Sequence, residues 1–89
     1  MPRPWEADPT AIMKRRLGIS PANLGNTDNV DGCPDIWELD NGDIAVIGRD
    51  LTEVYEHRLP QGAAIARDER LVVLPRNTLV AAKADIPDA

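Results

Sequence analysis

The stretch that decides the fold is Asp35-Ile36-Trp37-Glu38-Leu39-Asp40-Asn41-Gly42-Asp43-Ile44-Ala45-Val46-Ile47. Two runs of strand-forming residues flank the pair Asn41-Gly42. An Asn-Gly pair between two such runs is typical of a two-residue hairpin turn, because both residues tolerate the positive φ that a type I′ turn requires. We therefore predict a β-hairpin of strands 35–39 and 44–47.

A two-residue turn would also fix the register of the hairpin, with Leu39 opposite Ile44 and Trp37 opposite Val46. We predict that these residues share the core face and that Trp37 is buried in it. The other face would be half apolar, and we predict that it is partly covered or forms an interface. Its residues would be Ile36, Glu38, Ala45 and Ile47.

On the C-terminal side of the hairpin, the pattern changes to helical spacing. Asp50 and Glu53 form a capping-box pattern, and a helix over 51–59 is predicted to end at Pro60-Gln61-Gly62. An apolar strand over 71–74 and a short helix over 76–84 follow. The sequence thus predicts a small α+β domain over residues 33–89, with strand 71–74 added to the hairpin in a small antiparallel sheet.

The first 34 residues differ in composition from the rest. They contain five of the eight prolines and most of the turn-forming residues, which disfavour long regular structure. A short helix is predicted after Asp8, with Pro9 at its first position and Gly18 at its end. We predict that residues 1–32 form a flexible arm and linker that carries this helix and is dispensable for folding.

Length and charge exclude several classes of protein. The chain has 89 residues, a net charge of −5 and no Phe, so we expect one domain with a thin aliphatic core. An acidic chain is a poor match for nucleic-acid phosphates or an anionic membrane surface, and we expect neither as a partner. There is no apolar run near the roughly 20 residues of a membrane span, no signal-peptide core, and one cysteine. These features predict a cytoplasmic protein.

The catalytic and metal motifs are weak. Residues 27–38 have EF-hand spacing, but Thr27 stands where the loop needs Asp, and strand residues follow instead of a helix. Cys33 and His57 are the sole cysteine and histidine, which are too few soft ligands for zinc, and neither has a certain catalytic neighbour. Lys14-Arg15-Arg16 is expected to be a solvated basic face. We therefore expect no enzyme, no metal site and no other cofactor.

The most informative charge pattern is acidic. Between Asp28 and Asp43 the chain carries six carboxylates and no basic residue. This pattern fits a solvated loop and hairpin tip, and it also fits a docking surface that steers a basic partner. The candidate partner-binding residues are four hairpin carboxylates and two apolar neighbours. They are Asp35, Glu38, Asp40, Asp43, Ile36 and Ile47.

Three segments carry a resemblance to a known family. Cys33 opens the first predicted strand, Ile44-Ala45-Val46-Ile47-Gly48-Arg49-Asp50 forms a second strand with a trailing Arg-Asp, and Leu71 to Ala82 forms a last strand running into a short helix. In these features the chain resembles the BldB-type family of small actinobacterial proteins. The resemblance covers residues 33–84, without the family's Trp-Lys-Ser-Ser start and with an insertion over 50–69. Family members are typically encoded beside helix-turn-helix regulators and act through protein contacts. The resemblance therefore implies a partner of that class.

These patterns predict a non-catalytic protein-interaction module that regulates a DNA-binding, helix-turn-helix transcription regulator. An alternative is an antitoxin or immunity-like inhibitor, whose acidic hairpin would block a basic partner. A homodimer is compatible with both functions.

Overall fold

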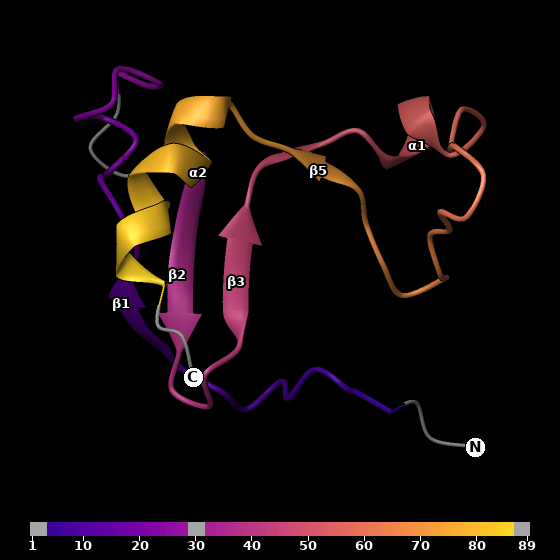
Figure 1. Cartoon of the computed structure of the whole chain (residues 1–89), viewed down its shortest axis with the longest axis horizontal. Helices are drawn as coiled ribbons and strands as arrows, with labels where there is room; N and C mark the ends of the chain where they lie inside the picture. Colours follow the sequence, from indigo (N-terminus) through magenta and orange to yellow (C-terminus); the bar gives the residue numbers. More distant parts are fainter. Residues whose placement is uncertain (1–3, 29–31, 87–89) are drawn as a thin grey trace.

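The computed structural model describes residues 4–28 and 32–86 and shows an α+β fold made of small antiparallel sheets and short helices (Figure 1). Within these residues the strands are β1 Met13–Arg16, β2 Asp35–Leu39, β3 Ile44–Ile47, β4 Arg49–Asp50 and β5 Val72–Val73. The helices are α1 Thr52–Tyr55 and α2 Arg76–Ala82, and the 3₁₀ turn η1 Lys83–Asp85 continues α2.

The main sheet has the strand order β1-β2-β3, with both pairs antiparallel. Helix α2 lies against one face of this sheet, over β2 (Figure 1). Between helix and sheet lies a small core in which Leu17, Ile36 and Ala82 are at most 2% exposed, and Leu74 packs against it from the side. The expectation of a thin aliphatic core is confirmed for the part of the chain that the structure describes.

The hairpin forms where the sequence predicts it, but its register differs by one residue. Glu38 lies opposite Ile44, and Trp37 lies opposite Ala45. The loop has three residues, because the Leu39 amide donates to the Asp43 carbonyl at 2.8 Å and the Gly42 amide donates to the Leu39 carbonyl at 3.0 Å. Gly42 has a φ of 90°, as a glycine bulge after a type I turn requires, so a type I′ turn is not formed.

This shift by one residue turns β2 over relative to β3, so Ile36 and not Trp37 shares a face with Ile44 and Val46. Ile36 faces the core under α2, whereas Trp37 is half-buried on the opposite face, so the prediction that Trp37 is a core residue is wrong. The Trp37 indole N–H donates to Asp35 Oδ2 at 2.9 Å, and the Arg16 guanidinium lies 4.9 Å from the ring centre. Trp37 is therefore held by polar and cation–π contacts.

The N-terminal segment is part of the fold, which corrects the prediction of a separate arm over residues 1–32. Met13–Arg16 is a strand and no helix, and the Leu17 amide donates to the Ile36 carbonyl at 2.9 Å. Leu17 is also one of the most buried side chains. Pairing with β2 outweighs the local helix signals after Asp8. The predicted linker includes residues 29–31, which lie outside the described residues together with 1–3 and 87–89.

The second sheet is another departure from the predicted architecture. The apolar strand is Val72–Val73, and it pairs with β4 in a separate two-stranded sheet, not with the hairpin. Gly48 separates β3 from β4 and packs closely, since a Cβ there would lie 2.8 Å from the Leu74 side chain and from the Val73 carbonyl. The predicted helix over 51–59 is limited to Thr52–Tyr55, whereas the one over 76–84 is confirmed with its end continued by η1.

Thr52, the first residue of α1, makes hydrogen bonds to Asp50 of β4 and to Leu71, the residue before β5. Its buried hydroxyl accepts the Leu71 amide at 2.8 Å and donates to Asp50 Oδ1 at 2.7 Å. The Thr52 amide donates to the same carboxylate oxygen at 3.0 Å. The N-cap residue of α1 is Leu51, so the capping box predicted for Asp50 and Glu53 is not formed, and Asp50 binds Thr52 from the position before the cap. The hydroxyl and then the amide of Thr52 hold the pKa of Asp50 below its usual range, against a small opposing effect of desolvation.

Replacing Thr52 with valine, which has the same shape but no hydroxyl, is expected to raise the pKa of Asp50 toward its ordinary value of about 3.9. Because the folded-state pKa is depressed, the contribution of Asp50 to stability is present above the ordinary value and is lost as the pH falls through the folded value. Carboxyl-carbon NMR titration measures the change. Asp8 is the internal control, because Thr10 lowers its pKa in the same way and its titration should not move.

Candidate protein-docking surface

Two of the six predicted contact residues, Asp35 and Glu38, are buried at 4% and 8% exposure. The Arg16 guanidinium binds Asp35 through two nitrogens, with Nε 3.0 Å from Oδ1 and Nη2 3.0 Å from Oδ2. Arg15 Nε lies 2.9 Å from Glu38 Oε1, and its Nη2 donates to the Asp85 carbonyl at 2.7 Å. These carboxylates form ion pairs within the fold, so the expectation that they lie on an exposed acidic surface is wrong.

The other four predicted residues divide between core and surface. Ile36 belongs to the core and cannot contact a partner, whereas Ile47 is exposed. Asp40 is exposed and accepts the Ile12 amide at 3.0 Å. Asp43 is half-buried and accepts the indole N–H of Trp5 at 3.2 Å. Of the predicted set, Asp40, Asp43 and Ile47 therefore reach the surface around the hairpin.

The residues considered for chemistry do not form a cluster in the described part of the chain. Cys33 is exposed, and His57 Nε2 lies 3.3 Å from Glu56 Oε1 on an exposed turn. Across residues 4–28 and 32–86, no three His, Cys, Asp or Glu side chains lie together as metal ligands would. In the same residues, helices long and apolar enough to cross a membrane are absent. Arg15 and Arg16 are not the free basic face expected from the sequence, since both bind carboxylates.

The fold exposes more surface than a globular monomer of its size. Its accessible surface is 7112 Å², whereas a folded monomer of 9.7 kDa exposes about 5,100 Å². Its radius of gyration is 14.5 Å, compared with about 12 Å for a compact domain of this length. The excess of about 2,000 Å² on this one chain is more than the roughly 800 Å² that each partner of a standard interface buries.

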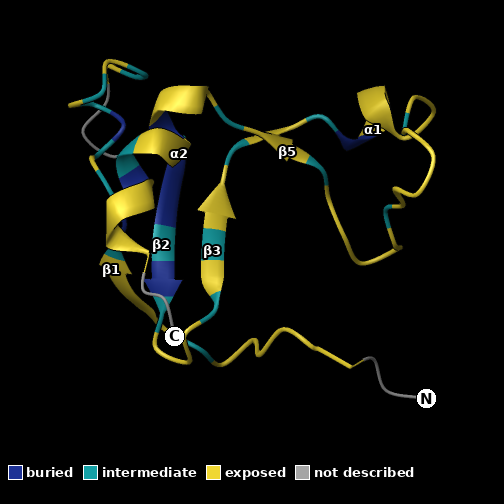
Figure 2. Ribbon diagram, in the orientation of Figure 1, coloured by how far each residue is buried: buried dark blue, intermediate teal, exposed yellow. Residues whose placement is uncertain are grey.

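Strand β3 is the most exposed apolar element of the sheet. It contains only Ile44, Ala45, Val46 and Ile47, and the three large side chains are exposed at 42%, 42% and 45%. Ile44 and Val46 lie on the same face as Ile36, but α2 covers β2 and does not reach β3 (Figure 2). Ile47 lies on the opposite face. Large aliphatic side chains exposed on both faces of one strand are typical of a binding surface.

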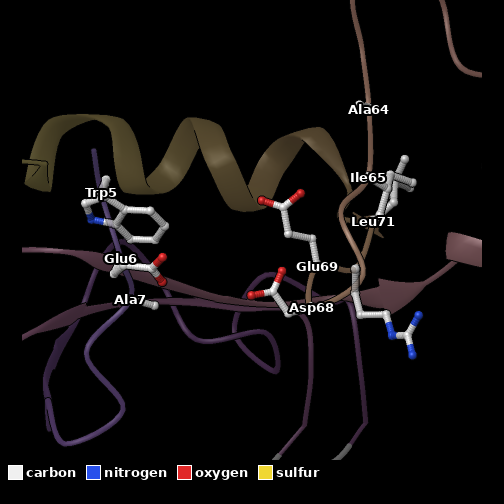
Figure 3. Close-up of a pocket in the computed structure, with 9 residues that line it drawn as sticks. Trp5, Glu6, Ala7, Ala64, Ile65, Asp68, Glu69 and Leu71 are labelled. Carbon is white, nitrogen blue, oxygen red and sulfur yellow. The ribbon is translucent and has the colours of Figure 1, made fainter. Parts of the chain in front are cut away.

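An open pocket of about 470 Å³ lies between the N-terminal segment and the loop that leads to β5 (Figure 3). Three carboxylates, those of Glu6, Asp68 and Glu69, point into the space between the Trp5 ring on one side and Ile65 and Leu71 on the other (Figure 3). Glu69 also accepts the Ala66 amide at 2.8 Å. The complete lining is Trp5, Glu6, Ala7, Ala64, Ile65, Asp68, Glu69, Arg70 and Leu71.

The outer face of α2 is a second apolar surface. Leu79 and Val80 are 55% and 61% exposed, and with Ile86 they border a shallow apolar depression. Leu79 therefore points outward, whereas Ala82 of the same helix is fully buried.

Comparison of the chain with protein-family models, curated proteins and solved structures found no match.

Proposed function

We propose that the chain is a non-catalytic protein-interaction module and that β3 is its docking surface. The observation that carries the proposal is the exposure of Ile44, Val46 and Ile47 on both faces of one strand. The large accessible surface and the small core support it, because an interface would bury apolar area that the fold leaves in water.

The partner class in this proposal is a helix-turn-helix transcription regulator, which follows from the BldB-type resemblance. The inhibitor alternative has less support. It needs an acidic hairpin that faces a basic active site, but Asp35 and Glu38 are neutralised by Arg16 and Arg15 inside the fold. Only Asp40 and Asp43 remain at the hairpin tip, so a docking surface led by apolar contacts agrees better with the geometry.

The proposal is tested with two variants that carry the same substitution at different apolar sites. Val46→Lys places a charge in β3, and Val80→Lys places one on the outer face of α2. Both positions are exposed, so both variants should fold. The tagged wild-type chain, expressed in its own host, is expected to co-purify one dominant protein. Val46→Lys should reduce its recovery by about tenfold or more, while Val80→Lys should leave it unchanged.

The captured protein is then purified, and its binary affinity for the wild-type chain and both variants is measured. A helix-turn-helix regulator with the expected order of affinities supports the proposal in full. If no protein is enriched above an unrelated tagged bait, the chain is not an interaction module. A loss caused by Val80→Lys alone moves the docking surface to α2.

A further inference from the structure

We infer that the chain forms a symmetric homodimer in which the β3 edges of two copies pair as antiparallel strands, with Ala45 at the two-fold axis. The inference goes beyond the proposed function, because it uses the backbone edge of β3 and leaves both faces of the strand open to a partner. The features that carry it are the free backbone groups of β3, the match of β3 to its own copy, the composition of the two sheet edges, and the surface that the fold exposes.

The backbone of β3 has free hydrogen-bonding groups on one side. In an antiparallel pair, the residues of one strand direct their N–H and C=O groups alternately toward the partner and away from it. The Asp43 carbonyl accepts the Leu39 amide and thus points toward β2. By alternation Ala45 also faces β2, whereas Ile44 and Val46 face away from it. Among the described strands β3 pairs only with β2, so the groups of these two residues are available for a further strand.

The outward groups of β3 match those of a second copy in antiparallel register. With Ala45 at the axis, Ile44 of each copy lies opposite Val46 of the other, and each such pair exchanges two N–H···O=C bonds. Ala45 then lies opposite Ala45 of the second copy in a non-hydrogen-bonded pair, where the Cα atoms are only about 4.5 Å apart. The smallest side chain of the strand thus occupies the closest contact, and β-branched side chains face each other in the two flanking pairs. The edge of β3 is therefore complementary to itself, as a two-fold interface requires.

The two edges of the main sheet differ in composition. The β1 edge carries Lys14, Arg15 and Arg16, and charged side chains on an edge strand oppose pairing with another chain. The β3 edge carries no charge and no proline between Ile44 and Ile47. Because the chain has a net charge of −5, two copies repel each other, and an uncharged strand is where they approach at the lowest cost. The fold thus protects one edge and leaves the other open to a second copy.

A dimer through β3 also covers surface that the single chain exposes. A standard interface buries roughly 800 Å² of each partner, which is more than four paired residues supply. The segment from β4 through α1 to β5 extends beyond the β3 edge (Figure 1), and the two-fold axis would direct this segment of each copy toward the other copy. Its exposed apolar side chains would add to the contact, and they are Val54, Tyr55, Val72 and Val73.

The first test is the mass of the purified full chain by sedimentation equilibrium. At roughly 100 μM, the wild-type chain should have twice the monomer mass of 9.7 kDa. Val46→Pro removes an outward N–H without removing a bond to β2, so it should weaken dimerisation by about tenfold or more. Val46→Thr keeps that N–H and a β-branched side chain, and it should change the dimerisation constant by less than about threefold.

A disulfide tests the register. Ala45→Cys places two sulfur atoms across the two-fold axis, at a Cα separation of about 4.5 Å that a disulfide can span. Ile47→Cys is the matched control, because the two sites would be about 14 Å apart along the strands and could not be bridged. Cys33 is exposed and is replaced by serine in both variants. Mild oxidation should link most of the Ala45→Cys chains into covalent dimers and few of the Ile47→Cys chains.

Amide hydrogen exchange examines the same contact in the wild-type chain. When the chain is diluted until the dimer dissociates, exchange at Ile44 and Val46 should become about tenfold faster or more, because their N–H groups lose the second copy. Exchange at Ala45 should change little, since its N–H faces β2 in the monomer as well. This measurement and the disulfide pair decide the matter if Val46→Pro does not fold.

The inference is overturned if the wild-type chain stays monomeric, or if folded Val46→Pro dimerises as well as the wild-type chain. It is also overturned if Ile47→Cys is linked as efficiently as Ala45→Cys, or if dilution leaves exchange at Ile44 and Val46 unchanged. The proposed function is tested separately by the captured protein. A monomeric chain that still captures its partner excludes the homodimer and leaves the interaction module intact, whereas a dimer that captures no protein has the opposite meaning.

Discussion

Gly18→Ala is expected to lower the free energy of unfolding by at least about 3 kcal/mol, whereas Gly25→Ala should lower it by about 1 kcal/mol. Both glycines lie in the left-handed region, with φ of 82° and 78°. A side chain at either position therefore meets the same backbone strain, and the pair differs in what surrounds the new Cβ.

At Gly18, a Cβ would lie 2.7 Å from the Ala82 nitrogen and 2.8 Å from the Ala81 carbonyl carbon. These are backbone atoms of α2 and cannot rotate away, so the end of β1 and the helix would have to separate. Gly25 has no atom within 4 Å of the corresponding position. The difference between the two variants thus measures the close approach of the N-terminal segment to α2.

Chemical denaturation of the wild-type chain and both variants gives the two free-energy changes. The expected loss at Gly18 is a large share of the roughly 4–13 kcal/mol that a domain of this length possesses. Equal losses for Gly18→Ala and Gly25→Ala would show that the N-terminal segment does not pack against α2 in solution, and the original prediction of a separate arm would then be restored.

The hairpin could be predicted from the sequence, but its register could not. Asn41-Gly42 fits a two-residue type I′ turn, and Asp40-Asn41-Gly42 fits a three-residue loop with a glycine bulge equally well. The choice depends on which face α2 covers, and that contact lies more than 30 residues away along the chain. Ile44 and Val46 lie on the face that α2 covers at β2, but α2 does not reach β3, so the sequence reading missed the exposure of these two residues.

The prediction of an acidic surface was wrong for a related reason, because it also depends on contacts between segments that are distant along the chain. No basic residue lies near Asp35 or Glu38 along the sequence, but β1 brings Arg16 and Arg15 beside them from 19 and 23 positions upstream. The local signals after Asp8 favour a helix, and a helix would not place these arginines along β2. The Trp5 pocket could not be foreseen either, since it joins two segments more than 50 residues apart and neither carries a motif.

Arg16→Met is expected to lower the free energy of unfolding by about 3 kcal/mol, because it leaves the Asp35 carboxylate buried without its cation. The side chains of Arg16 and Asp35 are 36% and 6% exposed, so water can reach the arginine more easily than the carboxylate. In the variant, Asp35 keeps its hydrogen bonds from the Ile36 amide and the Trp37 indole. These two neutral donors do not balance a buried negative charge. The expected cost lies at the low end of the range for a broken buried ion pair, because water reaches the Arg16 side of the contact and Asp35 keeps two hydrogen bonds.

A double-mutant cycle with Asp35→Asn separates the ion pair from the other roles of the two side chains. Asparagine keeps an acceptor for the Trp37 indole but carries no charge, so it should recover part of the loss in the Arg16→Met background. The coupling energy is expected to be about 1.5 kcal/mol or more. Strictly additive losses would mean that Arg16 stabilises the sheet through its stacking on Trp37 and not through Asp35.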